Sequence, residues 1–528
     1  MINALLGIDV GTTSTKAVLF DCQGVEMARA SSSPYHNLTP KTGWVEQDPE
    51  EIWAALLDTI RSVTREAGNG VNILALSMAV QSGSLVITNA DGEPLCPLVT
   101  WLDGRAEEVV NDWHTKGHQD WVKPLSGWSL YPSLCLPTIA WFKKNEPEIF
   151  ASAGKFLSLN DFLVSRLTGK MVTNPSNAGG MQLVEINTGQ WSSALLKLAG
   201  TNEANLSSIR PSGHVIGQIR SEICQQTGLP GHSVLVNGGH DQSCTALGLG
   251  IVNPGDWLLA CGTAWVFTGV LDTPDMTKLP VSLDLNFHAA PERWALSQSL
   301  GGLGASFEWW MKKAYLQTEK SANEITQKNN ASSSVIARNE AISPPSVIAR
   351  DEAISTRLGA YSSLNREIMD TRIDQQIFFL PMTGGHDDPA TTRRGGFLGL
   401  ELGQNRADLA RAIMESAAYE LRWALEPVKA SGLPIKRFWM VGGAAESPLW
   451  PAILADVTGI PISLPQYDNW PALGAAILAG YGAGIYPTLD QGMTVFNKEL
   501  STITPQSKVM KSYHQKYLKY KQLCHSYQ

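Results

Sequence analysis

The chain has 528 residues, more than a single hydrophobic core normally organises, so we expect two or three domains. Hydrophobic residues make up 43% of the sequence and charged residues 17%, a balance typical of globular proteins. The formal net charge of −8 argues against a nucleic-acid-binding surface, and no run approaches the ~18 apolar residues of a membrane span. We therefore expect neither nucleic acid nor a membrane as a partner.

The seven cysteines are scattered along the chain and form no C-x-x-C pair. An odd, unpatterned set indicates reduced thiols rather than a disulfide framework. The first residues also lack a basic segment followed by a long apolar one. We therefore expect no signal peptide and a cytoplasmic location.

The first recognisable element is a hairpin within LLGIDVGTTSTKAVLF, residues 5–20. The apolar runs Leu5–Ile8 and Ala17–Phe20 predict two paired strands. Gly11 and the hydroxyl residues 12–15 predict a tight loop whose backbone N–H groups can wrap a phosphate. Asp9, at the end of the first strand, is suited to hold a metal ion beside that phosphate. An ordinary hairpin with a polar turn explains the same residues, and this stretch alone does not separate the two interpretations.

The residues after the hairpin predict a strand, a helix and another strand. A turn at Asp21–Gly24 precedes the next strand, and Asp48 and Pro49 have the character of an N-cap and a first helical position. Apolar residues then repeat at helical spacing before the apolar run ILALSMAV. Strands that alternate with helices indicate an α/β architecture.

An acid follows a strand again in VLVNGGHDQSCTALGLG. Val234–Val236 predicts a strand, Gly238 and Gly239 let the backbone turn closely, and Asp241 follows. A carboxylate at such a strand end is suited to act as general base for a hydroxyl nucleophile. A helix-capping aspartate is the alternative, and on its own it is the commoner case.

Residues 256–271, DWLLACGTAWVFTGVL, repeat the order strand, Gly–Thr turn, strand. The turn is Gly262–Thr263, and the Pro–Gly pair in NPGD just before it is typical of a domain boundary. Two similar domains, each offering one phosphate loop to a shared cleft, would explain the two hairpins. Two unrelated hairpins remain the alternative, because the match in letters is weak.

A different repeat lies further along the chain. SVIARNEAIS (334–343) and SVIARDEAIS (346–355) differ at one position and follow a polar stretch of low complexity. Two copies are too few for a solenoid. We interpret residues 321–357 as a mobile surface insertion outside the active site, with a partner-docking motif as the alternative.

A third glycine turn appears in WMVGGAAESPLW. Gly442, Gly443 and Ala444 present a smooth surface on which a flat ring can lie, and Ser447 is suited to contact a ribose or a base edge. The spacing of a dinucleotide site and the Walker pattern are both absent from the sequence. At the C-terminus, Tyr513, Tyr517 and Tyr520 follow helical spacing and predict an amphipathic helix packed on the second domain.

Six blocks in this order resemble the FGGY family of carbohydrate kinases, a branch of the actin/Hsp70-like ATPase superfamily. The blocks are GIDVGTTSTKAVLFD, PLVTWLDGRAEE, GGHDQ, CGTA, GGFLGLELGQNRADLARAIMESAAYELR and VGGAAESPLWPAILADVTGIPI. The resemblance runs from about residue 4 to about 485. It implies an α/β fold with two ribonuclease-H-like (actin-like ATPase) domains around a central cleft. We expect an N-terminal domain at 1–252, a C-terminal domain at 253–490 and a helical tail at 491–528.

The resemblance also implies roles for individual residues in an ATP-dependent, Mg²⁺-dependent sugar kinase. Asp241 would be the general base, and Asp9 would lie beside Mg²⁺ and the γ-phosphate, so both are expected as catalytic residues and metal ligands. The expected ATP-binding residues are Thr12, Thr13, Lys16, Gly262, Thr263, Gly302, Gly443, Ala444 and Ser447. The expected substrate-binding residues are Gln81, Ser82, Gly83, Trp101, Asp103 and Asp241. Core packing for Trp101 and a helix-face ion pair for Arg105 remain alternatives.

Two blocks depart from the family and leave the sugar open. Xylulose kinases of the family usually have Q-M-H-G where this chain has Gln81–Ser84, and the usual G-E-R-x-P is replaced by GGHDDP. We expect a small ketose such as xylulose as substrate, with another polyol or an aldonate (glycerol, gluconate) as the alternative. A protein-directed nucleotide switch and a non-catalytic sugar-binding homologue are the competing functions, and a homodimer is left open.

Overall fold

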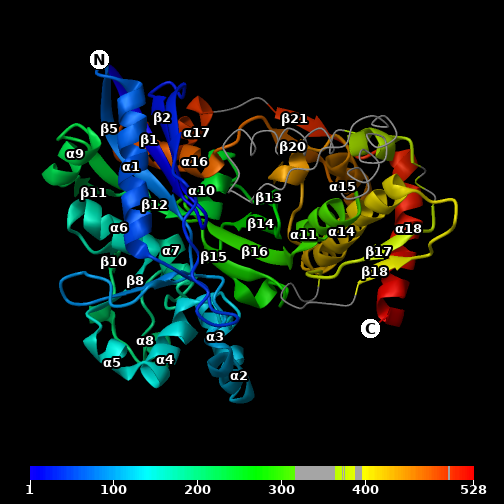
Figure 1. Cartoon of the computed structure of the whole chain (residues 1–528), viewed down its shortest axis with the longest axis horizontal. Coiled ribbons are helices and arrows are strands. Elements are labelled where there is room, and N and C mark those ends of the chain that lie inside the picture. Colours follow the sequence, from blue (N-terminus) through cyan, green and yellow to red (C-terminus); the bar gives the residue numbers. More distant parts are fainter. Residues whose placement is uncertain (316–362, 372, 374, 387–394, 497–499, 528) are drawn as a thin grey trace, which may run out of the picture. The chain divides into compact units, whose positions relative to one another are not determined.

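The computed structural model describes residues 1–315, 363–371, 373, 375–386, 395–496 and 500–527 (Figure 1). The predicted insertion at 321–357, with its repeat, lies outside these residues. Among the helices of the described ranges, none is long and apolar enough to cross a membrane. The seven cysteines all lie within the described residues, and none of them forms a disulfide there.

A six-stranded sheet contains the predicted opening hairpin. Its order is β11 (Val215–Gln218), β12 (Val234–His240), β5 (Val71–Val80), β1 (Ile2–Val10), β2 (Thr15–Asp21), β3 (Glu26–Ser31). The antiparallel pairing of β1 with β2 confirms the hairpin. β1 is parallel to β5, and β5 is parallel to β12. The C-terminal ends of these three strands therefore meet at one edge of the sheet.

Helices α1 (Pro49–Ala67) and α16 (Trp470–Gly482) cover opposite faces of this sheet. α1 begins as predicted, because the Asp48 carboxylate accepts a hydrogen bond from the N–H of Glu50 at 2.9 Å. Side chains at even positions of β1, such as Leu6 and Ile8, share a buried apolar cluster with α1. Those at odd positions face α16, since successive side chains in a strand alternate.

Glycines let α16 approach its neighbours backbone to backbone. A Cβ added at Gly7 of β1 would lie 1.8 Å from the carbonyl oxygen of Ala472, and one at Gly474 would lie 1.9 Å from that of Cys244 in α10 (Asp241–Gly248). No side chain fits in such gaps. α16 therefore fixes both the first strand and the helix that begins with Asp241.

Gly7→Ala should destabilise the protein by at least about 1–3 kcal/mol, because the new methyl group must push α16 away from β1. Urea unfolding measures the change in the free energy of unfolding. Gly231→Ala is the matched control, since nothing lies within 4 Å of its added Cβ. Equal stabilities of the two variants would contradict this close packing.

A smaller four-stranded sheet supports the segments around residues 47, 81–84 and 100–105. Its order is β4 (Glu46–Gln47), β7 (Leu98–Val99), β6 (Leu85–Thr88), β8 (Lys155–Ser158). A buried cluster that includes Leu85, Val99 and Phe156 packs it against several helices. The helices in this part of the chain are α2 (Glu107–Thr115), α3 (Gln119–Ser126), α4 (Cys135–Asn145), α5 (Pro147–Ser152), α6 (Leu159–Thr168), α7 (Pro175–Gly180) and α8 (Ser193–Ala199).

A seven-stranded sheet repeats the strand order of the first sheet. Its order is β15 (Asp284–Phe287), β16 (Trp294–Gly301), β14 (Trp265–Leu271), β13 (Asp256–Cys261), β19 (Arg437–Val441), β20 (Ile462–Pro465), β21 (Leu500–Ile503). From β16 to β21 these strands take the places of β3, β2, β1, β5, β12 and β11. β19–β20 is parallel and β20–β21 antiparallel, as in β5–β12 and β12–β11. The two predicted hairpins thus occupy equivalent places in two sheets of related topology.

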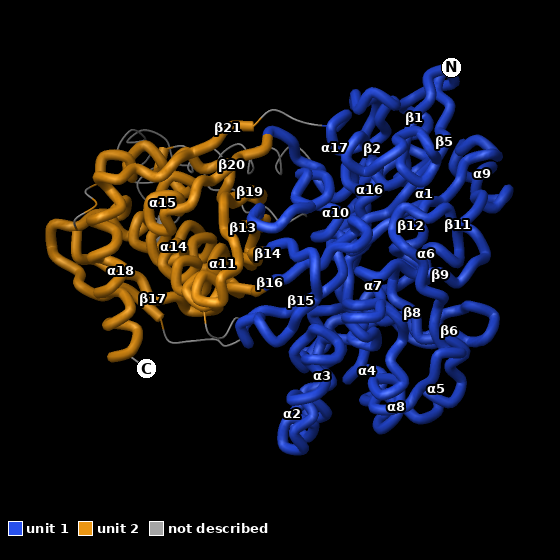
Figure 2. Tube along the Cα trace, turned by 180° about the vertical axis from the view of Figure 1, so that it is seen from behind, with its two compact units in different colours: residues 1–256, 268–297, 466–499 blue, residues 257–267, 298–465, 500–528 orange. Residues whose placement is uncertain are grey.

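The chain divides into two compact units (Figure 2). Unit 1 contains residues 1–256, 268–297 and 466–499, and unit 2 contains residues 257–267, 298–465 and 500–528. The main helices of unit 2 are α11 (Leu303–Trp310), α14 (Arg406–Ala430), α15 (Trp450–Thr458) and α18 (Ser507–Tyr527). Tyr513, Tyr517 and Tyr520 of α18 are buried, and Tyr513 accepts a hydrogen bond from Arg411 of α14, which confirms the predicted C-terminal helix.

The remaining elements are short or lie at the periphery of this arrangement. They are β9 (Val172–Thr173), β10 (Ser208–Ile209), β17 (Phe378–Leu380), β18 (Gly396–Leu398), α9 (Ser221–Thr227), α17 (Leu489–Val495), three 3₁₀ helices (Glu203–Asn205, Met276–Lys278, Gly443–Glu446) and a π-helical turn (Met311–Tyr315).

Candidate active site

Two predicted catalytic acids lie together where β1, β5 and β12 end. Asp9 pairs with Ala79 of β5, and Ala79 pairs with Gly239 of β12. Asp241 follows two residues after Gly239 as the first residue of α10. The parallel strand ends therefore bring together carboxylates that are far apart in the sequence.

Burial and a like charge raise the pKa of Asp9 to about 7. Burial is the largest cause, the nearby Asp241 carboxylate adds to it, and Lys16, opposite Asp9 on β2, lowers the pKa. A pair of carboxylates in a poorly solvated place is destabilised when both are charged. A cation bound between them would relieve this repulsion.

Mg²⁺ fits this pair of acids. No cluster of three or more His, Cys, Asp or Glu side chains that could hold a metal ion occurs in the described residues. Mg²⁺ does not need one, because it usually takes one or two carboxylates together with waters and substrate phosphates. Asp9 and Asp241 supply those two carboxylates.

Asp9→Asn should stabilise the protein without ligands at pH 8 and have little effect near pH 4. The folded state binds the Asp9 proton more tightly than the unfolded state, so the stability of the wild type falls as pH rises from about 4 to about 7. Asparagine removes this cost. Thermal unfolding at several pH values in the presence of a chelator measures the difference.

Asp58→Asn on α1 is the control, because the side chain of Asp58 is 67% exposed. A pH dependence in Asp9→Asn equal to that of the wild type would contradict the buried carboxylate pair.

The hydrogen bonds around Asp241 leave one of its oxygens open. Oδ1 accepts from the N–H of Gln242 at 2.6 Å and lies 3.0 Å from Nε2 of His240, whereas Oδ2 has no hydrogen-bond partner among the described residues. The N–H of His240 donates to Ser176 Oγ at 2.9 Å. Sequence reasoning did not single out His240 or Ser176, although His240 stands within GGHDQ. Asp241 is the first residue of α10 and not its N-cap, which is His240, and no side chain caps this helix. The helix-capping alternative is therefore not what the structure shows.

The phosphate loop predicted at residues 11–15 is a tight turn. The N–H of Gly11 donates to the carbonyl oxygen of Ser14 at 3.2 Å, and the carbonyl oxygen of Thr13 accepts from the N–H of Tyr35 at 2.8 Å. Thr13 and Lys16 are exposed and Thr12 is half-buried. The loop is therefore supported from residues 32–47 and leaves polar groups accessible.

The predicted substrate segment at residues 81–84 is closely joined to Trp101. Gln81 donates its N–H to the carbonyl oxygen of Val10 at 2.9 Å, and Ser84 Oγ accepts from the N–H of Trp101 at 3.3 Å. Gly83 has φ +81°, and its added Cβ would lie 3.2 Å from the Cβ of Trp101. Ser82 Oγ is buried and finds no partner within the described part of the chain. With 41% of its surface exposed, Trp101 is not a core residue.

Asp103 is engaged by protein groups at both oxygens. Oδ1 accepts from the N–H and Nε of Arg105, each at 2.8 Å. Oδ2 accepts from Arg105 Nη2 at 2.9 Å and from the N–H of Val45 at 2.7 Å. Asp103 is 1% exposed. Arg105 does form an ion pair, but it is a buried pair with Asp103 and Glu46 in the turn before α2 and not the helix-face pair of the alternative. This pair occupies the Asp103 carboxylate.

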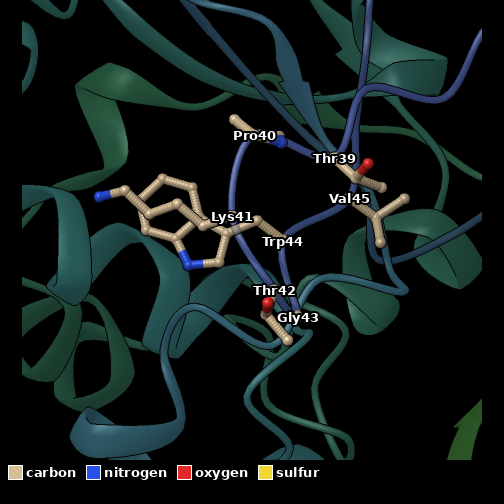
Figure 3. A pocket seen from close by; sticks show the side chains of 7 residues that line it. All are labelled: Thr39, Pro40, Lys41, Thr42, Gly43, Trp44 and Val45. Carbon is tan, nitrogen blue, oxygen red and sulfur yellow. The ribbon is translucent and has the colours of Figure 1, made fainter.

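The loop held by Asp103 also lines a pocket of about 560 Å³ (Figure 3). Residues 39–45 form its wall, and the ammonium group of Lys41 lies 4.3 Å from the ring centre of Trp44. The Arg105 guanidinium lies 4.1 Å from the centre of the same ring. None of the predicted site residues lines this pocket.

In unit 2, glycines of neighbouring segments surround the predicted nucleotide-binding turn Gly262–Thr263, between β13 and β14. A Cβ at Gly304 would lie 2.1 Å from the carbonyl oxygen of Gly262, and one at Gly442 (φ +95°) 2.7 Å from that of Cys261. The carbonyl oxygen of Thr263 accepts from the N–H of Ala305 at 3.1 Å. Gly262 and Thr263 are exposed. Backbone segments with no side chains between them thus leave room for a ligand to contact the main chain.

Two further glycines extend this wall. Gly302, the residue before α11, would place a Cβ 2.6 Å from Thr383, and Gly384 (φ +76°) would place one 2.2 Å from the carbonyl oxygen of Leu300. Gly304 and Gly384 were not foreseen. Glycine spacing is too common a signal to single them out.

The predicted adenosine turn has one open glycine and one occupied serine. Nothing lies within 4 Å of a Cβ added at Gly443, and Ala444 is buried. Ser447 Oγ accepts from the N–H groups of Leu449 and Trp450 at the start of α15, and it donates to Asn365 Oδ1 at 3.3 Å. Ser447 therefore already serves as a local cap.

Comparisons with known proteins identify the class and then the family. Three solved structures share the fold. They are a xylulose kinase and a gluconate kinase from Lactobacillus acidophilus (TM-score 0.84 and 22% identity for both) and a glycerol kinase from Plasmodium falciparum solved with ADP (TM-score 0.82, 21% identity). Each covers at least 99% of this chain, and this chain covers 98% of each. The fold is thus that of the actin-like ATPases.

The N-terminal domain model of the FGGY family of carbohydrate kinases matches residues 4–248, and the C-terminal domain model matches residues 258–483. An autoinducer-2 kinase from Yersinia enterocolitica is 29% identical over 92% of this chain and 88% of its own length. The xylulose kinase of Escherichia coli is 26% identical over 90% of both. The chain belongs to the FGGY family of carbohydrate kinases, as its motifs predicted, and is a sugar or polyol phosphotransferase.

Proposed function

We propose that this protein transfers the γ-phosphoryl group of ATP to a hydroxyl of a small ketose such as xylulose. The observation that carries the proposal is the position of Asp241, one oxygen of which is open at the strand edge it shares with Asp9. In the reaction, the sugar hydroxyl oxygen forms a bond to the γ-phosphorus, and the bond from that phosphorus to the bridging oxygen of ADP breaks. The hydroxyl proton passes to Asp241, and ADP leaves.

In this proposal, the other predicted site residues bind the nucleotide, the metal ion or the sugar. Thr12, Thr13 and Lys16 contact nucleotide phosphates, and the glycine-walled turn in unit 2 contacts the nucleotide through its backbone. Asp9 and Asp241 would hold Mg²⁺, which would neutralise charge on the phosphates when bound. Trp101 and the segment Gln81–Gly83 contact the sugar.

The choice among sugars is tested by a panel. Ser82 and Gly83 leave more room than the Met-His pair usual in xylulose kinases of the family. Substrates whose shape differs from that of xylulose therefore need to be tested too. D-Xylulose, glycerol and gluconate belong to the panel. Autoinducer-2 belongs to it too, because several relatives at 28–29% identity are autoinducer-2 kinases.

ADP release coupled to a spectrophotometric readout identifies the substrate. We expect ADP release that depends on the added compound, with D-xylulose among the best substrates. Nucleotide hydrolysis that no sugar stimulates would instead support a protein-directed switch. Sugar binding without turnover would support a non-catalytic homologue.

Asp241→Asn should lower kcat about 10²- to 10⁴-fold, because the amide cannot accept the hydroxyl proton. Binding of an ATP analogue, measured by calorimetry, should persist. Asp91→Asn is the control, since Asp91 lies in an exposed turn. A kcat near that of the wild type would show that Asp241 is not the general base.

Gly443→Val should raise the KM for ATP about 10-fold or more without loss of thermal stability. No protein atom lies within 4 Å of a Cβ added at Gly443, so the new side chain points into open space where a ligand would collide with it. Gly403→Val, also with nothing within 4 Å of its added Cβ, is the matched control in the same unit. An unchanged KM for ATP would show that the nucleotide does not lie on this turn.

A further inference from the structure

Thr12, in the phosphate loop of unit 1, is held at two of its atoms by side chains from distant segments. Its Oγ1 accepts a hydrogen bond from Nε1 of Trp101 at 2.9 Å. Its carbonyl oxygen accepts one from Nε2 of Gln47 at 2.8 Å. A loop of small, half-exposed residues thus takes its position from Trp101 and Gln47.

The segment 81–84 supports Trp101 in the position from which it contacts Thr12. The N–H of Trp101 donates to Ser84 Oγ, and Ser84 donates to Gln81 Oε1. The lack of a side chain at Gly83 lets the two segments touch. Since the indole N–H is directed at Thr12 while 41% of the residue stays exposed, Trp101 can contact a ligand and the phosphate loop simultaneously.

The Gln47 contact depends on the buried pair Asp103–Arg105. Gln47 is 1% exposed and lies in β4, where Gln47 pairs with Leu98 of β7. The residues just before it are fixed by the pair, because Val45 donates its N–H to Asp103 and Glu46 accepts from Arg105 Nη2 at 2.6 Å. Asp103 and Arg105 therefore position the strand that carries Gln47.

The charged pair Asp103–Arg105 is buried, and its hydrogen bonds favour the charged form of Arg105. Burial lowers the pKa of the Arg105 guanidinium. The hydrogen bonds to Asp103 and Glu46 and their negative charges together raise it by more, so the net shift of the pKa is upward. Buried ion pairs seldom add net stability, and the best-attested reason to keep one is that it fixes a particular geometry. The geometry fixed here is that of residues 45–47.

We propose that Trp101 and Gln47 are positioning residues that hold Thr12 in the conformation that binds nucleotide phosphate, with Asp103 and Arg105 acting through Gln47. The assignment of phosphate binding to Thr12 rests on the proposed function. The segment Trp101–Arg105 then supports nucleotide binding indirectly, by holding Thr12 in place. This role is separate from any contact of the Trp101 ring with the sugar.

The test is the dissociation constant of a non-hydrolysable ATP analogue with Mg²⁺, which requires no knowledge of the sugar. Trp101→Phe and Gln47→Met each remove one hydrogen bond to Thr12 and should raise this constant about 5-fold. Trp191→Phe is the matched control, since it removes an indole N–H bonded to the carbonyl oxygen of Ser207 elsewhere in unit 1. The control should leave the constant unchanged.

A double-mutant cycle separates this role from general loss of structure. Thr12→Val removes the acceptor of the Trp101 bond, so adding Trp101→Phe to it should have little further effect. Thr12→Ser keeps the hydroxyl and should retain the coupling to Trp101. Additive effects of Thr12→Val and Trp101→Phe would overturn the role of Trp101.

The kinetic signature of Gln47→Met is a higher KM for ATP with an unchanged KM for the sugar that the panel identifies. A change in both constants, or in neither, would overturn the role of Gln47. Failure of the proposed function is distinct from this, because it appears as a wild type that phosphorylates no sugar in the panel. The analogue measurements then still decide whether Thr12 depends on Trp101 and Gln47.

Discussion

The close contact of α16 with β1 and α10 is the constraint on which the candidate catalytic centre depends. Gly7 and Gly474 admit the helix to within backbone contact of the strand that ends in Asp9–Val10 and of the helix that starts at Asp241. Van der Waals packing at this distance leaves little freedom for either element. Because α16 comes from residues 470–482, the relative position of the two acids depends on a segment late in the chain.

This rigidity allows an unfavourable arrangement of charge to persist. Two carboxylates near each other, one of them with its pKa raised to about 7, lower the stability of the unliganded fold. Such strain survives only where the surrounding structure fixes the groups. It is also the condition under which a divalent cation gains most from binding, since its positive charge offsets the repulsion between the two carboxylates.

The loop GTTST has the opposite character. Its residues are small, and of the five only Thr13 is exposed and only Thr15 is buried. Hydrogen bonds from Tyr35, Gln47 and Trp101 to its backbone and side chains give it a defined shape. Unit 2 uses another solution for its turn at Gly262–Thr263, where glycines in neighbouring segments bring backbones into direct contact. The same strand order therefore supports one turn through polar side chains and the other through the absence of side chains.

The sequence by itself determined the local elements and the family. Alternating and helical apolar patterns, the Asp48–Pro49 helix start and the Gly–Thr turns are signals carried by neighbouring residues, and the structure confirms the hairpin, helix and strands that they predicted. What only the tertiary structure decided is which side chains meet. Trp101 and Thr12 are 89 residues apart, and no local pattern encodes their bond. Asp103, expected beside a sugar, has both oxygens taken by Arg105 and Val45, and His240 gained its place beside Asp241 without having been singled out. The physical reason is that periodicity fixes the face on which a residue lies, whereas its partner is set by how strands and helices distant in sequence pack together.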